Sequence, residues 1–422
     1  MANGVARLFG NRGRRLRLLA HSRRLLLLML PLGALTGWIM ALAIHGAGLL
    51  GEHLHRWLGP SHLILLLPLL GLFLATRVLD DSGVGEVSLT DDVKMSHGNP
   101  YAAFPLGPSL VKAAACACTV ALGGSSGLEG PGKWLGAALG LQVHRTVTAL
   151  STSFRPLRRL IGSARTMVAC GAAGALAAVF RAPLSGALFA AEHDGHLGLA
   201  NLIGPLVAAA AGYLTFAAFA GTAPLLHLDR PYGLRWTELL YALPLGLACG
   251  LAASLFTALQ ARLRRLLAPV PLRWRGLLGA LGLVVLMLPA HLNFQDLPIT
   301  LGGGVELVHR ILEVPPDLRT ALLFFGLKLT ATALTLACGG VGGTWLPCVA
   351  MGAALGAAFD AWLLPGYGGL MAMLGATALT GAFHGTLLVP VVFLAETTAQ
   401  APLVVPALVA TVVAYLVARE WT

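Results

Sequence analysis

A long internal repeat restricts what this chain can fold into. Residues 110–140, LVKAAACACTVALGGSSGLEGPGKWLGAALG, align without a gap with residues 326–356, GLKLTATALTLACGGVGGTWLPCVAMGAALG, at an offset of 216 positions. The two copies share a lysine, a threonine, a Gly-Gly pair, a proline and the whole GAALG segment. The repeat predicts two related halves, which we place at residues 25–225 and 235–422.

Two further pairs of segments follow the same order in both halves. GAAGALAAVFRAPLSGALFAAE at 171–192 matches GATALTGAFHGTLLVPVVFLAE at 375–396, at an offset of 204 positions. A weaker pair precedes both repeats, SGVGEV at 82–87 and GGGVEL at 302–307. Duplicated halves of this kind commonly bind their substrate at the interface between the repeats.

The composition indicates a membrane environment for these halves. Hydrophobic residues make up 57% of the 422 residues and charged residues 11%, which is too apolar for a soluble domain. About twelve apolar runs lie between residues 25 and 418, and many are short or interrupted by Gly or Pro. Because non-helical backbone survives at membrane depth only beside protein or water, we expect an all-α polytopic membrane protein with broken and re-entrant helices.

The net charge of +11 comes from arginines that cluster beside the apolar runs, at residues 12–24, 155–165 and 262–275. A positive-inside bias explains this distribution more simply than nucleic-acid binding does. We therefore expect residues 1–24 to form a basic cytoplasmic N-terminus of a multi-pass protein of the cell inner membrane. The six cysteines lie in apolar runs without zinc-site spacing, so we expect packing residues, and neither a metal nor a cofactor nor an enzymatic activity.

A glycine-rich turn runs into a proline and then a helix in both long repeats, at residues 123–134 and 339–350. Proline suits the first turn of a helix, and glycines let the preceding backbone turn its N–H groups inward. The N-terminus of a helix offers free N–H groups and a positive dipole end to anions. Two such helices that face each other are expected to form a binding site for a small anion.

The same turn contains the spacing of a phosphate loop. Gly127 to Lys133 fits the pattern G-x-x-x-x-G-K, in which backbone N–H groups cradle a nucleotide phosphate. A phosphate loop also requires Ser or Thr after the lysine and a strand before the turn. Trp134 follows Lys133 and the surroundings are apolar helix, so the pattern argues against a phosphate loop.

An intramembrane serine protease is a remote alternative for this turn. Ser126 would be its nucleophile and would need a histidine from another helix as base. This hypothesis leaves the repeat unexplained, because the second copy has Gly342 where the first has Ser126. The histidines available to it are His144, His193 and His384.

Four motifs, taken in order, resemble the CLC family of chloride channels and chloride/proton antiporters. GLEGP at 127–131 resembles that family's GREGP, GGTWLP at 342–347 resembles GGIFAP, and SGVG at 82–85 resembles GSGIP. The segment from Phe180 to Glu192 is similar to the FNAPL segment and its helix. The resemblance covers about residues 80–420. It implies a CLC-type fold of two inverted repeat halves, a homodimer with a pore in each subunit, and a short form without CBS domains.

The resemblance also implies roles for individual residues. Glu129 would be the gate, because its carboxylate would compete with the anion for the backbone N–H groups and protonation would release it. The Ser82 hydroxyl would bind the anion, and Ser82 matches the family residue associated with chloride preference, although nitrate and other halides stay open. Further anion-binding positions would be Gly83, Gly127, Leu128, Gly130, Thr344, Trp345 and Leu346.

The chain departs from the family at positions that bear on mechanism. Leu128 replaces the arginine of GREGP, and Gly85 replaces the proline of GSGIP. The inner proton-transfer glutamate of the antiporters falls on His193, beside Glu192, and both are candidate members of a proton relay. A solvated helix end is the alternative for His193. The family's pore-lining tyrosine has no counterpart, since Tyr415 lies too early, so we expect a differently lined inner gate.

Three lysines lie within apolar sequence near these motifs. Lys112 and Lys328 recur at corresponding positions of the two halves, and we expect both to contribute to a positive field that attracts anions. Lys133 either extends to the membrane surface or replaces the positive charge that is missing at Leu128.

These features predict transmembrane transport of chloride or another small anion through a path gated by Glu129. We expect this transport to be channel-like or weakly coupled to protons. The alternative is a chloride/proton antiporter that uses Glu129 and His193. The expected partners are chloride or other small anions, protons, the lipid bilayer and a second copy of the chain, and nucleic acid is not among them.

Overall fold

The computed structural model describes Arg23 and residues 25–58, 66–87, 98–193, 199–226, 228, 232–233, 236–294, 301–363 and 369–421. Most of the basic segment predicted at residues 1–24 therefore lies outside the described residues. Within them the fold is built of helices, and the pairing of Gly127 with Gly343 is the one isolated β-bridge.

The first half contains a π-helix that leads into a long helix, followed by a series of helices of very different length. In chain order the elements are η1 (Leu25–Met29), α2 (Leu30–Leu58), α3 (Leu67–Asp81), α5 (Pro100–Ala103), α6 (Leu106–Ala121), α7 (Glu129–Ser153), η3 (Arg155–Arg159), α8 (Ala164–Phe180), α9 (Pro183–His193) and α10 (Leu199–Ala220).

The second half has a closely similar order. Its elements are α11 (Trp236–Leu267), α12 (Leu272–Phe294), α13 (Val305–Glu313), α14 (Leu318–Ala337), α15 (Trp345–Leu363), α16 (Leu370–His384), α17 (Leu388–Thr398), η4 (Ala401–Leu403) and α18 (Val404–Trp421).

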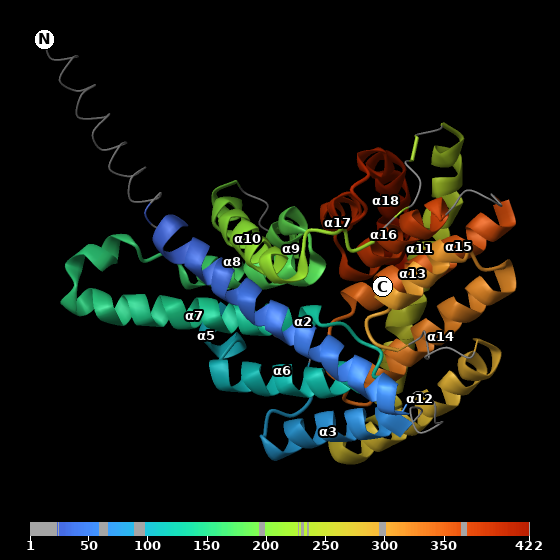
Figure 1. The fold of residues 1–422 in the computed structure, drawn as a ribbon, viewed down its shortest axis with the longest axis horizontal. Helices are drawn as coiled ribbons and strands as arrows, with labels where there is room; N and C mark the ends of the chain where they lie inside the picture. Colours follow the sequence, from blue (N-terminus) through green and yellow to red (C-terminus); the bar gives the residue numbers. More distant parts are fainter. Residues whose placement is uncertain are drawn as a thin grey trace, which may run out of the picture.

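The predicted repeat is present in the packing of these helices. α2 packs against α8 and α10, and α11 packs against α16 and α18 in the same way. α7 packs on α8 as α15 packs on α16. In Figure 1 the first half, blue to green, lies on the left and the second half, yellow to red, on the right. α3 meets α12 at one side of the molecule and α9 meets α17 between the halves, so the helices form two inverted repeats.

Close approach of the repeated helices depends on glycines at corresponding positions. A side chain on Gly136 of α7 would collide with the carbonyl oxygen of Gly171 in α8, and one on Gly352 of α15 with that of Gly375 in α16. Small residues let membrane helices pack with their backbones in contact. The GAALG segment that recurs in the sequence is thus the contact surface of α7 and α15 with their neighbours.

Side chains hold the starts of several helices. Ser163 accepts a hydrogen bond from the Thr166 amide at the start of α8, at 3.0 Å, and Asp317 accepts one from Thr320 at the start of α14, also at 3.0 Å. Asp360 of α15 accepts bonds from the first amides of α16. The otherwise unpaired N–H groups of these helix ends are therefore satisfied inside the protein.

Six of the described helices are long and apolar enough to cross a membrane: Leu26–Leu58, Asn201–Ala220, Trp236–Leu267, Leu318–Ala337, Trp345–Leu363 and Ala401–Glu420. Four further apolar helices among the described residues are shorter, namely α6, α8, α16 and α17. These lengths agree with the predicted multi-pass membrane protein with broken helices.

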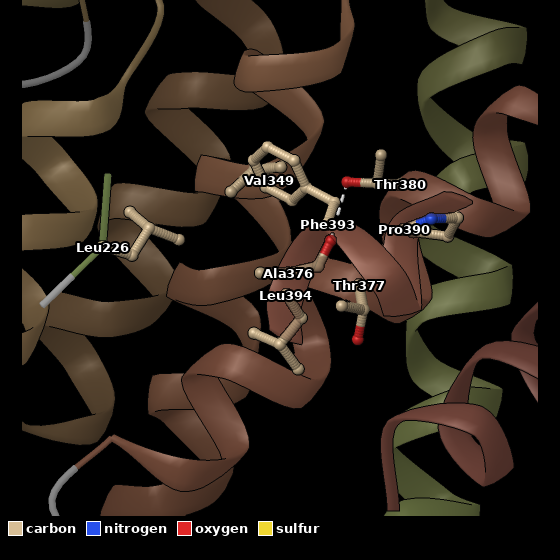
Figure 2. A pocket seen from close by; sticks show the side chains of 8 residues that line it. All are labelled: Leu226, Val349, Ala376, Thr377, Thr380, Pro390, Phe393 and Leu394. Carbon is tan, nitrogen blue, oxygen red and sulfur yellow. Dashed lines mark hydrogen bonds between the residues drawn. The ribbon is translucent and has the colours of Figure 1, made fainter. Parts of the chain in front are cut away.

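A small pocket lies among α15, α16 and α17, beside Leu226 (Figure 2). The hydroxyl of Thr377 donates to the Leu374 carbonyl and that of Thr380 to the Ala376 carbonyl, within their own helix. The pocket therefore offers a ligand no uncommitted hydroxyl, and we regard it as a gap in apolar packing. It is lined by Leu226, Val349, Ala376, Thr377, Thr380, Pro390, Phe393 and Leu394.

Candidate functional site

The two glycine-rich turns of the repeat lie against each other at the centre of the molecule. The Gly127 amide donates to the Gly343 carbonyl at 2.9 Å, and the Gly343 amide donates to the Gly127 carbonyl at 2.8 Å. These residues are 216 positions apart, so the bonds are reciprocal under the symmetry that relates the two halves. We call the segments 123–128 and 339–344 the twin turns.

Threonines of the preceding helices reinforce the twin turns in a second reciprocal pair. The Ser125 amide donates to Thr335 Oγ1 of α14 at 3.1 Å, and the Val341 amide donates to Thr119 Oγ1 of α6 at 3.0 Å. Each threonine hydroxyl in turn donates to a carbonyl of its own helix. Each half therefore provides acceptors for the buried amides of the other.

Glu129 begins α7 directly after the first turn, and only 4% of its surface is exposed. Its carboxyl group lies across the bridge between the twin turns, since a side chain on either Gly127 or Gly343 would collide with it. Oε1 accepts a hydrogen bond from the Leu346 amide of α15 at 3.2 Å. Oε2 is buried and has no hydrogen-bond partner among the described residues.

The N-termini of α7 and α15 thus meet at one carboxyl group. Trp345 begins α15 at the position that corresponds to Glu129, and its ring is fully buried. The backbone around Gly130 approaches the opposite turn so closely that a Cβ there would lie 3.0 Å from the Gly343 nitrogen. Leu128, the residue before α7, is half-buried. The structure thus gathers most of the predicted anion-binding backbone around Glu129.

Ser82 and Gly83 lie on a different turn, at the end of α3. Ser82 is exposed, and its hydroxyl donates to the Leu79 carbonyl of its own helix at 3.0 Å. Gly83 has a φ of +70° and Gly85 a φ of +72°. Proline cannot adopt a positive φ, which explains why the chain departs from the related motif at Gly85. A Cβ on either glycine would meet no atom within 4 Å, so this turn borders open space.

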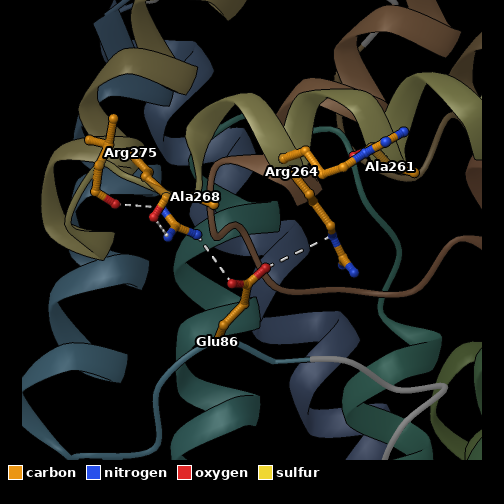
Figure 3. Close-up of polar contacts among 7 residues, drawn as sticks. Glu86, Ala261, Arg264, Ala268 and Arg275 are labelled. Carbon is orange, nitrogen blue, oxygen red and sulfur yellow. Dashed lines mark hydrogen bonds and ion pairs between the residues drawn. The ribbon is translucent and has the colours of Figure 1, made fainter.

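An ion-pair cluster that the sequence did not predict follows this turn (Figure 3). Glu86 pairs with Arg275 of α12 at 3.1 Å and lies 3.9 Å from Arg264 of α11. The Arg275 guanidinium also donates to the carbonyls of Val270 and Ala268 in the α11–α12 connection. The turn that carries Ser82 is therefore tied to the second half of the chain.

The two recurring lysines lie in different surroundings. Lys328 is fully buried and donates to the Gly302 carbonyl at 2.8 Å, while the Gly302 amide donates to the Gly124 carbonyl of the first turn at 3.1 Å. Lys112 instead lies over the Trp134 ring, with Nζ 5.4 Å from the ring centre. Both place positive charge within the membrane-embedded core, and Lys328 is linked to the twin turns through one glycine.

Lys133 lies one helical turn after Glu129 and belongs to an aromatic cluster. Lys133 is 5% exposed, and its ammonium group lies 5.1 Å from the centre of the Phe189 ring of α9. The Phe189 and Trp345 rings are 5.1 Å apart, and Trp345 is also 5.1 Å from His384. Phe180 packs against Trp345 as well. Lys133 therefore points into the protein and does not extend to the membrane surface.

Glu192 caps a helix of the opposite half. Its two carboxylate oxygens accept hydrogen bonds from the amides of Leu387, Leu388 and Val389 at the start of α17, at 2.7 to 3.2 Å. His193 is the last residue of α9, and its side chain lies outside the part of the structure that is described. Its predicted contribution to a proton relay therefore stays a prediction.

The surroundings of Ser126 do not match those of a nucleophile. Its fully buried hydroxyl donates to the Val341 carbonyl at 3.3 Å. Of the histidines named for a protease, His144 contacts Tyr101 and the Gly162 carbonyl, and His384 contacts Thr344. Ser126 fills the space beside Gly342, where a second side chain would collide with it, which explains why the repeat has serine in only one copy.

Tyr415 lies on α18 near the end of the chain. Its ring is half-buried and packs under the Arg419 guanidinium, 4.6 Å from the ring centre. Tyr415 therefore contacts a residue of its own helix, and no described contact joins it to the twin turns.

Comparison with known proteins yields a family and close relatives in sequence. Residues 67–419 match a family described as voltage gated chloride channel. A putative chloride channel protein, ClcB-like, of Ralstonia nicotianae is 32% identical over 322 residues, 74% of this chain and 72% of that protein. The H(+)/Cl(-) exchange transporter ClcA of Salmonella typhimurium is 27% identical over 321 residues, 71% of this chain and 63% of that protein.

Solved structures have the same fold. A CLC-type fluoride/proton antiporter superposes with a TM-score of 0.73 and 25% identity over 94% of this chain and 95% of that chain. A slow cyanobacterial Cl-/H+ antiporter superposes with a TM-score of 0.78 over 94% of each chain, at 19% identity, a level at which the likeness concerns the fold.

Proposed function

The chain belongs to the CLC family of chloride channels and transporters, and from this premise we propose that it exchanges chloride for protons across the membrane. In this proposal Glu129 both closes the anion path and carries the proton. The twin turns and the N-termini of α7 and α15 form the anion site.

The observation that carries this proposal is the position of the Glu129 carboxyl group. It lies against both Gly127 and Gly343 and accepts a bond from the Leu346 amide, so a negatively charged group occupies the point where two helix N-termini converge. That point favours anions because of its free N–H groups and positive dipole ends. A chloride ion that takes this position must displace the carboxylate, and protonation makes the displacement easier.

Positive charge around the site supports an anionic substrate. Lys328 reaches the loop that packs on the first turn, and Lys133 of α7 and Lys112 of α6 are buried. Buried ammonium groups in a region of low dielectric constant raise the local concentration of anions. Both curated relatives described above are named for chloride, which supports chloride as the anion.

Antiport is better supported than the channel-like path that we expected from the sequence. The Salmonella relative is named an exchange transporter, and the solved structure at 25% identity is a fluoride/proton antiporter. Glu129, which an exchanger needs in order to couple protons to anions, is in place and buried.

We also propose that two copies form a homodimer in the inner membrane with cytoplasmic N-termini. Leu184 at the start of α9 and Leu388 at the start of α17 are both about two-fifths exposed, at 42% and 43%, at corresponding positions of the two halves. Cysteine cross-linking at these positions in vesicles tests the dimer, and a protease site fused before residue 25 tests the orientation.

The proposed exchange is tested with purified protein in liposomes that contain high chloride. We expect chloride efflux down its gradient to drive protons into the liposomes, which is measured with chloride and pH electrodes in parallel. Glu129→Gln is expected to keep a chloride flux but to move no protons. Glu420→Gln, an exposed carboxyl group at the end of α18, is the matched control and should behave as wild type.

Two results would overturn the proposal. Wild-type protein that moves chloride without protons would be a passive path, and a Glu129→Gln variant that moves protons as wild type does would remove Glu129 from the mechanism. Fluoride in place of chloride in the same assay determines which halide is carried more rapidly.

A further inference from the structure

An imidazole lies next to the anion site and has no part in the mechanism described so far. His384 ends α16, and its Nε2 lies 3.4 Å from the Thr344 hydroxyl of the second twin turn. Its ring stacks beside Trp345, with 5.1 Å between ring centres. Thr344 directly follows Gly343, against which the Glu129 carboxyl group lies. Along the second twin turn, Thr344 with its hydroxyl group therefore lies between the Glu129 carboxyl group and the His384 imidazole.

The groups that face His384 are mostly aromatic, with one cation. α9 contributes Phe189, with 6.4 Å between ring centres, and α15 contributes Trp345. Phe383 packs on the ring from the preceding position of α16. From α7 the ammonium group of Lys133 acts on the imidazole electrostatically. The ring therefore lies in a region of low polarity.

The chain is exposed directly after His384, at the end of α16. Gly385, which follows His384, is exposed, and a Cβ at this position would meet no atom within 4 Å. Its φ of +66° lets the chain leave the helix here. His384, itself half-buried, thus lies between the second twin turn and the exposed residue Gly385.

The other acidic candidate for a relay is already engaged. Glu192 uses both oxygens to accept backbone hydrogen bonds from the start of α17, only three residues after His384. These bonds commit both of its oxygens to capping the helix start.

We propose that His384 passes protons between Glu129 and the open space beside Gly385, with the Thr344 hydroxyl between them. The inference rests on the proposed exchange function. In the structure the Glu129 carboxyl group bonds the Leu346 amide and no hydroxyl group, so in the proposed transfer it first turns toward Thr344. Protonated Glu129 then gives its proton to the Thr344 oxygen as the Thr344 hydroxyl gives its own to Nε2. Nδ1 then releases a proton to water, and the neutral ring returns as its other tautomer. Each O–H or N–H bond that breaks is matched by one that forms, so no further reactant is needed.

The test measures chloride efflux and proton uptake in the same liposomes for wild type, His384→Gln and Thr344→Val. We expect His384→Gln to keep chloride flux within about twofold of wild type and to lower proton uptake by about 100-fold or more, the loss typical of a missing proton-transfer group. Thr344→Val should lose proton uptake in the same way. His309→Gln is the matched control, because His309 binds the Leu225 carbonyl away from the twin turns, and it should behave as wild type.

Ionisable and non-ionisable replacements separate proton transfer from packing. His384→Glu should regain part of the proton uptake and shift its pH profile, while His384→Phe should not regain it. Unchanged proton uptake in His384→Gln would overturn this inference and leave the exchange function standing. Loss of chloride flux in both His384→Gln and His384→Phe would also overturn it, because the ring would then serve packing. Absence of proton uptake in wild type would instead contradict the exchange function itself.

Discussion

Glu192 and Glu396 each cap the helix that carries the other. Glu192, near the end of α9, accepts hydrogen bonds from the first amides of α17, and Glu396, near the end of α17, accepts bonds from the amides of Leu184 and Ser185 at the start of α9. The two glutamates are 204 positions apart, the offset of the second repeat. The side chains of Glu192 and Glu396 therefore cap the N-termini of both α9 and α17, the two short helices that lie between the halves.

These caps lead to a prediction for stability. Glu192→Gln and Glu396→Gln should each lower the free energy of unfolding by about 1–2 kcal/mol, because the neutral amide accepts fewer and weaker bonds from the helix start. Thermal unfolding in detergent measures this loss. Since its oxygens are already engaged, Glu192→Gln should leave proton coupling unchanged, and a selective loss of proton uptake in this variant would return Glu192 to the relay.

The glycines beneath Glu129 lead to a prediction for gating. Gly343→Ala places a methyl group where the carboxyl group lies, so the carboxylate should leave the bridge. Overpacking of about 1–2 kcal/mol corresponds to an increase of about 5- to 30-fold in the open population, which we expect as faster chloride flux at neutral pH. Gly326→Ala on α14, where a Cβ meets no neighbour, is the control. Equal flux in Gly343→Ala and wild type would contradict the gate position.

The ion pair behind the Ser82 turn leads to a prediction for anion affinity. Glu86→Gln should free the turn and weaken the apparent affinity for chloride by up to about fivefold, since a partly exposed pair contributes about 1 kcal/mol or less. The chloride dependence of flux measures this change. The charge reversal Glu86→Arg with Arg275→Glu should restore part of the affinity. If Ser82 has no part in anion binding, neither variant will change it.

The two recurring lysines should respond differently to the same substitution. Lys328→Met removes a charged donor from the Gly302 carbonyl beside the twin turns, and we expect a loss of about 1.5–3 kcal/mol in stability together with slower chloride flux. Lys112→Met removes a cation from the face of Trp134 and should cost about 1 kcal/mol. Thermal unfolding and flux assays on both variants check that Lys328→Met has the larger effect. A larger effect of Lys112→Met would contradict the closer link of Lys328 to the twin turns.

The sequence alone predicted the architecture because the repeat is long and because its two copies share glycines at corresponding positions, which chance would seldom produce. The gap-free alignment at 216 positions predicted that two turns run into two facing helices, and Gly127 and Gly343 do pair across the pseudo-twofold axis. The isolated Glu129 within apolar sequence marked the carboxyl group that lies between the twin turns, because burying such a residue is costly without a role.

Other features depend on contacts that the repeat does not encode. His384 corresponds to Phe180 in the first half, so the repeat did not mark it, and its relation to Thr344 and Trp345 follows only from the helix packing. The pairing of Glu86 with Arg275 joins residues 189 positions apart without a shared pattern. The reciprocal caps did leave a signal, since both copies of the second repeat end in Ala-Glu, but the sequence suggested a relay role for Glu192 instead.

The bridge between the twin turns also bears on how the protein is made. The amides of Ser125 and Gly127 find their acceptors at Thr335 and Gly343, which are synthesised more than two hundred residues later. At about 5–20 residues per second, the first half waits on the order of 10–40 s in the membrane before those acceptors emerge from the ribosome. During that interval its central turn must be sheltered by water or by the insertion machinery, so a truncated product that ends before residue 335 should be recognised and degraded as an unfinished protein.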